Sequence, residues 1–211
     1  MTEEEWVNCT DPKPMLEFLL GKASDRKLRL FAVACCRRVW PLLAEEWSRQ
    51  AVELAEKYAD GLCSDEQLEE AGKRAGWAAA WAGQGSAAEA AAWAAAGKGE
   101  VGWVEITAAH AGWAETADES PRPFHCDLLR DIFGNSFSSP VINPAWLGSN
   151  GGTVPIIART IYDERAFDRL PDLADALEEA GCDNEEILSH CRQTGPHVRG
   201  CWALDLILGK V

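Results

Sequence analysis

The stretch SDRKLRLFAVACCRRVWP, Ser24 to Pro41, carries the pattern that decides the fold. Its apolar residues recur at intervals of three or four, which is the spacing of one helix face. They are Leu28, Phe31, Ala32, Cys35 and Val39. Ser24 is a favourable helix cap, and Pro41 lacks the amide hydrogen that a helix interior needs. The stretch therefore predicts a helix that buries one apolar stripe and ends near Pro41.

The same pattern continues on both sides of this stretch. Before it, Thr2-x-x-Glu5 has the form of a capping box and Asp11-Pro12 opens a second short helix that Gly21 closes. After it, apolar residues keep a 3.6-residue period from Leu43 to Gly61, and Ser64-x-x-Gln67 caps a further helix. Alternation with a period of two is not sustained anywhere. We therefore expect an all-α chain, folded as an irregular multi-helix bundle.

The middle of the chain, from Ala71 to Ala117, is rich in alanine, glycine and tryptophan. Alanine favours helix and each interior glycine weakens it by about 1 kcal/mol, so we expect one or two helices with a break at Gly97-Lys98-Gly99. The indoles are expected to fill space between closely packed helices. The alternative is an exposed tryptophan-rich binding surface.

The composition changes again at Glu119-Ser120-Pro121-Arg122-Pro123, which is typical of a linker. This predicts two helical subdomains, 1–118 with the Ala/Trp-rich segment and 124–211. In the second, helices are expected over 127–133, 153–162, 168–180, 183–191 and 198–208. The turn-rich segment 137–152 needs anchoring to the core. The apolar residues available for this are Phe137, Ile142, Trp146 and Leu147.

Several strings resemble an uncharacterised family of planctomycete proteins. They are DPKPMLEFLLGKASDRKLRLFAVACCRRVW (11–40), DLLRDIFGN (127–135), IYDERAFDRLPDLADALEEAGC (161–182) and HCRQTGPHVRGCWALDLILGK (190–210). The four strings make up 82 of the 211 residues, and the resemblance is weakest in the Ala/Trp-rich middle. It implies a variable spacer between two better-defined ends, and it implies no activity.

Charge and composition exclude several classes of protein. Thirty-four acidic and 20 basic residues give a net charge of -14, which repels phosphate backbones, so non-specific nucleic-acid binding is not expected. The opening Met-Thr-Glu-Glu-Glu does not have the form of a secretory signal, and the Ala/Gly-rich stretch 75–97 is a poor membrane span. We expect a cytoplasmic protein, not associated with membranes, whose eight cysteines are reduced. The sequence sets no oligomeric state.

A group of soft metal ligands lies near the C-terminus: Cys182, His190, Cys191, His197 and Cys201. Four of them would surround a zinc ion if the last two helices brought them together. Their spacing is not a standard zinc motif, and His190 and Cys191 point about 100° apart on a helix. The alternative is structural, with the cysteines in the core and the histidines hydrogen-bonded or at helix ends.

A cysteine nucleophile is a second chemical hypothesis, with Cys126 beside His125 or Cys191 beside His190. Adjacency in sequence does not supply the required geometry, because the base must reach the thiol and be oriented by a third group. Motifs of serine hydrolases, P-loop enzymes, zinc proteases and dinucleotide-binding enzymes are absent. The vicinal pair Cys35-Cys36 is expected to be buried. The sequence therefore does not favour an enzyme.

Charges are also distributed unevenly. Six cations gather near the start, whereas 163–186 holds ten acids and two arginines. The six are Lys22, Arg26, Lys27, Arg29, Arg37 and Arg38. Such blocks form a solvated face, dock against each other within the fold, contact a protein partner, or bind an anion.

The function expected from these observations is that of a helical protein-interaction module, adaptor or regulatory, without catalytic activity. Its partner would be a protein, and no cofactor is expected. The alternative is a zinc-binding protein or a cysteine-dependent enzyme centred on the C-terminal Cys/His cluster.

Overall fold

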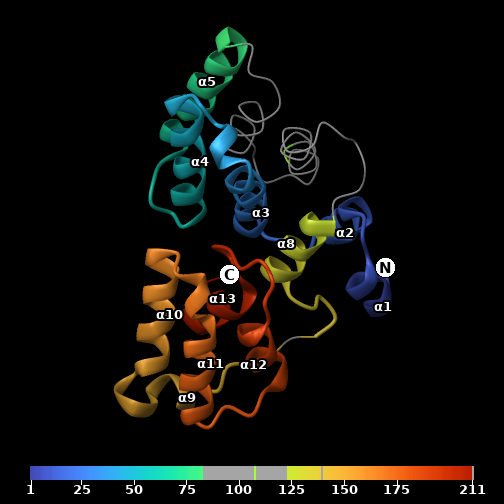
Figure 1. Cartoon of the computed structure of the whole chain (residues 1–211), viewed down its shortest axis with the longest axis vertical. Coiled ribbons are helices and arrows are strands. Elements are labelled where there is room, and N and C mark those ends of the chain that lie inside the picture. The colour runs from blue at the N-terminus through green and yellow to red at the C-terminus, as the bar shows by residue number, and fades with distance from the viewer. Residues whose placement is uncertain (83–106, 108–122, 139, 211) are drawn as a thin grey trace. The chain divides into compact units, whose positions relative to one another are not determined.

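The structure is a computed structural model that describes residues 1–82, 107, 123–138 and 140–210 (Figure 1). Every regular element in these ranges is helical, with eleven α-helices, three short 3-10 helices and no strand. The prediction of an all-α chain is confirmed. None of these helices combines the length and the apolar character that crossing a membrane requires.

The chain divides into two compact units, Met1–Leu129 and Arg130–Val211. The division falls inside α8 (Pro123–Phe133), whereas the sequence places a boundary near residue 120. The N-terminal unit contains α1 (Glu3–Asn8), α2 (Pro12–Leu19), α3 (Asp25–Arg38), a 3-10 turn (Trp40–Leu42), α4 (Glu46–Ala59) and α5 (Asp65–Ala82). The C-terminal unit contains the remaining elements.

The N-terminal helices begin where the caps predict. Thr2 and Glu5 form the complete capping box of α1, and Asp11 and Ser24 accept backbone N–H groups of α2 and α3. The apolar stripe of α3 is buried as expected, and α4 packs against both α3 and α5. Capping and helical periodicity therefore account for this part of the fold.

Helix α5 continues to Ala82 and so enters the Ala/Trp-rich segment. Its buried face carries Leu68, Ala71 and Ala75. Trp77 lies two residues, about 200°, beyond Ala75 on the helix and is 69% exposed, so the expectation of a core indole is wrong at this position. The expected break at Gly97-Lys98-Gly99 lies outside the described residues, as do Trp93, Trp103 and Trp113.

The C-terminal unit is built from the end of α8, α9 (Pro144–Gly148), a 3-10 turn (Ser149–Gly151), α10 (Thr153–Glu164), a 3-10 turn (Phe167–Arg169), α11 (Leu170–Glu179), α12 (Glu185–Arg192) and α13 (Trp202–Leu208). Helix α10 packs against α11 and α13, and α11 packs against α12. Ile161, Leu173, Leu177, Ile187 and Leu204 are fully buried between these helices.

Two expectations for this unit are wrong in detail. The last helix begins at Trp202 instead of Val198, because Gly200 takes a φ of +96° that a right-handed helix does not contain. Of the four predicted anchors of segment 137–152, Phe137 is 43% exposed, whereas Ile142, Trp146 and Leu147 pack against the core. Because the last helix begins only at Trp202, residues 193–201 form an irregular loop between α12 and α13.

Candidate metal centre

Four side chains that can bind a metal ion converge in the C-terminal unit: Asp131, His190, His197 and Cys201. Each offers one ligand atom, and these four atoms all lie within 4.8 Å of one another. Asp131 lies in the last turn of α8, His190 lies in the last turn of α12, and His197 and Cys201 lie in the loop that ends at the N-terminal cap of α13. Three separate segments of the chain therefore meet at one point.

The local backbone structure explains why each segment places its side chain at this centre. Gly134, with a φ of +64°, ends α8 directly after the turn that carries Asp131. Helix α12 ends at Arg192, and the extended backbone of Gln193 sends the chain into the loop that carries His197. The left-handed backbone of Gly200 then turns the chain into Cys201 and α13.

The shortest contacts centre on one carboxylate oxygen and one ring nitrogen. Asp131 Oδ1 lies 2.7 Å from His197 Nδ1 and 3.3 Å from His190 Nε2. His190 Nε2 also lies 3.1 Å from Cys201 Sγ. The same atom of His190 therefore contacts both the acid and the thiol.

The opposite side of each ligand is also held by hydrogen bonds. The backbone N–H of Val198 donates to Asp131 Oδ2 at 2.9 Å. His197 Nε2 lies 3.3 Å from the carbonyl oxygen of Gln193, and His190 Nδ1 lies 3.0 Å from that residue's side-chain amide. The Trp202 ring lies against His190, with ring centroids 4.8 Å apart. These contacts orient the ligand atoms toward the common centre.

The acid and the histidine beside it have altered affinities for protons. Burial by itself raises the pKa of Asp131, which is 1% exposed, but hydrogen bonds from His190 and His197 and their charges outweigh it, so the pKa lies below its ordinary value. Burial lowers the pKa of His197, but the hydrogen bond to Asp131 and its negative charge reverse this, so the pKa is raised. The pair therefore favours a carboxylate beside an imidazolium when no metal is bound.

The thiol of Cys201 is protonated in the same state. Burial raises its pKa well above the ordinary value, and the charge of Asp131 raises it further. Hydrogen bonds from the backbone N–H groups of Leu204 and Ala203 act in the opposite direction and favour the thiolate. A metal ion at the centre would deprotonate this thiol, because coordination stabilises the thiolate directly.

The structure brings together three of the five residues predicted as ligands. His190, His197 and Cys201 converge, but Cys182 and Cys191 do not; all three cysteines are buried in the core of the unit, and only Cys201 places its sulfur in the group. Burial raises the pKa of Cys191 to about 12, so its thiol is a poor nucleophile. Its divergence from His190 follows from their adjacency on α12.

Asp131 is missing from the ligands predicted from the sequence. A signal for it exists, because Leu128, Asp131 and Ile132 have the i, i+3, i+4 spacing of one helix face. An acid at a position where apolar residues are expected requires a buried partner. Its partners lie on α12 and in the loop that follows, far along the chain, and only the fold reveals them.

The arrangement around His190 is not that of a catalytic triad, and the hypothesis of a cysteine nucleophile stays a prediction. In a catalytic triad the nucleophile and the acid contact opposite nitrogens of the histidine. Here Cys201 and Asp131 both contact Nε2 of His190. In the N-terminal unit, His125 and Cys126 are both buried.

The predicted block of cations is used largely within the N-terminal unit. Two arginines form ion pairs between α3 and the α4 region, Arg26 with Asp60 and Arg37 with Glu56, each at 3.1 Å. Three more lie over aromatic rings: Lys22 over Phe18, Arg29 over Tyr58, and Arg38 over Phe124. Lys27 is half-buried in the first turn of α3. That this block contacts a protein partner stays a prediction.

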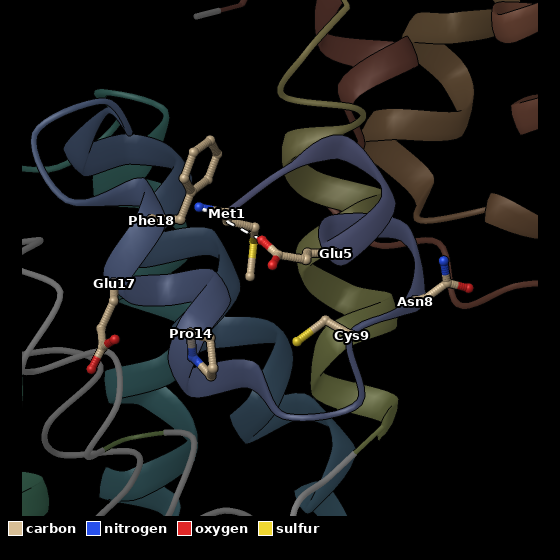
Figure 2. Close-up of a pocket in the computed structure, with 7 residues that line it drawn as sticks. All are labelled: Met1, Glu5, Asn8, Cys9, Pro14, Glu17 and Phe18. Atoms are coloured by element: carbon tan, nitrogen blue, oxygen red, sulfur yellow. Dashed lines mark ion pairs between the residues drawn. The ribbon is translucent and has the colours of Figure 1, made fainter.

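A surface groove of about 610 Å³ lies beside α1 and α2 (Figure 2). It is lined by Met1, Glu5, Asn8, Cys9, Pro14, Glu17 and Phe18. The Cys9 thiol donates to the carbonyl oxygen of Asp11, and the amino group of Met1 pairs with Glu5 at 3.9 Å. The donor atoms of this groove do not converge as those around Asp131 do.

Comparison with protein-family models, with curated proteins and with solved structures finds no match. The geometry of the chain's own residues is therefore the basis for a functional proposal.

Proposed function

We propose that the C-terminal unit is a metal-stabilised helical module in which Asp131, His190, His197 and Cys201 hold one Zn²⁺ ion. The observation that carries the proposal is the convergence of four ligand atoms, from three separate segments, to within 4.8 Å of one another. A buried hydrogen-bonding network needs paired partners, but it does not need four potential ligands that point at one centre.

The spacing of the ligand atoms is close to that of a tetrahedral zinc site. Zinc bonds of about 2.0 to 2.3 Å place neighbouring ligand atoms about 3.3 to 3.7 Å apart. The contacts of His190 Nε2 with Cys201 and Asp131, 3.1 and 3.3 Å, are nearly that long. Side-chain shifts of about 1 Å bring the other pairs into this range.

The chemical nature of the ligands favours zinc over the hard cations. A thiolate and two imidazoles bind Zn²⁺ well, whereas Mg²⁺ and Ca²⁺ prefer six or more oxygen ligands. The centre offers a single carboxylate, that of Asp131, whose other oxygen accepts from Val198. Monodentate coordination through Oδ1 follows from that hydrogen bond.

The burial of the centre supports a structural role for the ion. Asp131 and Cys201 are 1% and 0% exposed, and the side chains of His190 and His197 are 8% and 6% exposed. Four protein ligands complete a tetrahedral shell, so no position is left for a substrate or a reactive water. The ion would instead fasten α8, α12 and the loop before α13 together, and its binding energy would add to the stability of the fold.

The proposal bears on the interaction module that the sequence predicts. Zinc would hold the C-terminal helices in one arrangement, which is what a docking surface requires. The identity of a partner stays a prediction that rests on the sequence alone.

The experiment is a measurement of bound metal together with thermal unfolding of the whole chain. We expect about one zinc per chain after dialysis, and a chelator should lower the melting temperature. Cobalt substitution should produce a sulfur-to-cobalt charge-transfer band and the visible spectrum of a tetrahedral site. Chains that bind no zinc from a zinc-containing buffer, with a melting temperature that chelator does not change, would overturn the proposal.

A pair of cysteine variants gives a matched control. Cys201→Ser and Cys191→Ser each remove one fully buried thiol from the same unit, but only Cys201 belongs to the centre. We expect Cys201→Ser to lose zinc and the charge-transfer band, whereas Cys191→Ser keeps both. Equal retention of metal in the two variants would show that Cys201 is not a ligand.

A further inference from the structure

One residue outside the centre contacts both histidines. Gln193 is the C-terminal cap of α12, three residues after His190 and four before His197. Its side-chain amide nitrogen Nε2 lies 3.0 Å from Nδ1 of His190, and its backbone carbonyl lies 3.3 Å from Nε2 of His197. In each case Gln193 contacts the ring nitrogen that faces away from the centre.

The carbonyl contact determines how His197 is protonated. A carbonyl oxygen only accepts hydrogen bonds, so Nε2 of His197 must carry its hydrogen to bond Gln193. In the neutral ring the lone pair then lies on Nδ1, the nitrogen that faces Asp131. Binding a metal through Nδ1 releases the proton on that atom to solvent and leaves the bond to Gln193 intact.

The amide contact can do the same for His190. The amide nitrogen faces Nδ1 in this structure, and a 180° rotation of the amide group puts its oxygen in the same place, where it accepts from an N–H at Nδ1. The hydrogen at Nδ1 leaves the lone pair on Nε2, which faces Cys201 and Asp131.

We propose that Gln193 is the positioning residue of the centre. It selects opposite tautomers in the two ligands, so that His190 binds the ion through Nε2 and His197 binds it through Nδ1. The inference rests on the proposed zinc site and adds a role for a residue that is not itself a ligand. Hydrogen bonds of this kind fix the ring orientation of metal-bound histidines and raise metal affinity.

The test compares three variants of exposed residues, so loss of folding does not obscure the result. Gln193→Leu removes the side-chain acceptor but keeps the backbone carbonyl, Gln193→Glu keeps an acceptor, and Thr194→Leu is the matched control one residue on. Zinc affinity is measured by competition with a chelating dye. We expect Gln193→Leu to weaken binding by about 10- to 100-fold, with Gln193→Glu and Thr194→Leu close to the wild-type chain.

Nitrogen-15 spectra of the zinc-loaded wild-type chain give a second readout that a purely structural role would not move. We expect one histidine coordinated through Nε2 and one through Nδ1, with the other nitrogen of each protonated. Wild-type affinity in Gln193→Leu, or coordination of both rings through the same nitrogen, overturns the role of Gln193 while the zinc site stands. Failure of the wild-type chain to bind zinc overturns both proposals.

Discussion

Buried charged side chains have different kinds of partners in the two units of the chain. In the N-terminal unit charges are matched in pairs, as Arg37 is with Glu56 and Arg26 with Asp60. In the C-terminal unit Asp131 alone receives contacts from two histidines and a backbone N–H, and one of those histidines also contacts a thiol. The first arrangement joins two helices, whereas the second gathers ligand atoms around a point.

This difference shows that convergence, more than the number of polar residues, distinguishes a candidate site from ordinary packing. The cations of the first unit are the denser cluster in the sequence, yet their partners are separate acids and aromatic rings of the same unit, which do not meet at one point. The residues around Asp131 are scattered in the sequence and meet only in space. The two arrangements should therefore respond differently to the same kinds of substitution.

Loss of the acid at the centre should have the largest effect. Asp131→Ala leaves the histidines and the Val198 N–H without their acceptor, and breaking such a buried network costs about 3 to 5 kcal/mol of unfolding free energy. Asp183→Ala, which alters an exposed acid in the same unit, should have little effect. Urea unfolding measures both, and equal stabilities would show that Asp131 is not central to this unit.

Paired replacement should separate the two arrangements. Arg37→Met leaves Glu56, with 5% of its side chain exposed, buried beside an apolar residue, at a cost of about 2 kcal/mol. Adding Glu56→Leu should recover most of that loss, because a pair can be exchanged for apolar residues.

The same exchange at the centre should fail. In Asp131→Leu with His197→Leu, the Val198 N–H and His190 still lack an acceptor, so the double variant should be no more stable than Asp131→Leu alone. A double-mutant cycle in urea gives the coupling energies. Similar recovery in both units would contradict the contrast.

Two glycines with nearly the same backbone give a smaller effect. Gly134 and Gly209 have φ angles of +64° and +65°, but a Cβ at Gly134 would lie 3.0 Å from the Trp202 ring, whereas the space beside Gly209 is open. Gly209→Ala should cost about 1 kcal/mol for the left-handed backbone. Gly134→Ala should cost about 1 to 3 kcal/mol more, because it pushes Trp202 away and with it the support of His190. Thermal unfolding distinguishes the two, and equal losses would show that this contact is unimportant.

The smallest effect is the change of stability with pH. Because folding raises the pKa of His197 above its ordinary value of 6.5, protonation of this ring stabilises the metal-free fold. The stabilisation is complete below pH 6.5 and is lost as pH rises through the raised pKa. Because folding lowers the pKa of Asp131 below its ordinary value of 3.8, ionisation of this carboxyl group stabilises the fold above pH 3.8. That stabilisation is lost as pH falls through the lowered pKa. With chelator present, the melting temperature should therefore fall from pH 6 to 8.

With zinc, the dependence should reverse, because the ligands must lose protons to bind the ion. Melting curves recorded from pH 5 to 8, with zinc and with chelator, measure both trends. Parallel curves would contradict a metal that competes with protons at this centre.

Most of the helices could be predicted from local patterns. The capping box at Thr2, the cap at Ser24 and the apolar stripe of α3 each act within a few residues of the chain, so the sequence shows them directly. Errors occurred where a backbone angle or a helix face decided the result. Gly200 delays the last helix, and Trp77 falls on the solvent side of α5.

The candidate centre could be predicted in part. His190, His197 and Cys201 stand out as soft ligands close together in the sequence, but so do Cys182 and Cys191, which are core residues. Residue type alone does not separate a ligand from a buried thiol. A ligand is distinguished by the orientation of its side chain toward the centre, and that orientation depends on how its segment is packed in the fold.

The sequence by itself determined that this chain is helical, because capping and the 3.6-residue period act between neighbours along the chain. Only the tertiary structure decided which residues meet. Asp131 is far from both histidines in the sequence, and it reaches them because α8 ends at Gly134 and the loop from Gln193 to Cys201 folds back over it. Contacts at such distances in sequence arise from the packing of whole elements, and no local pattern encodes them.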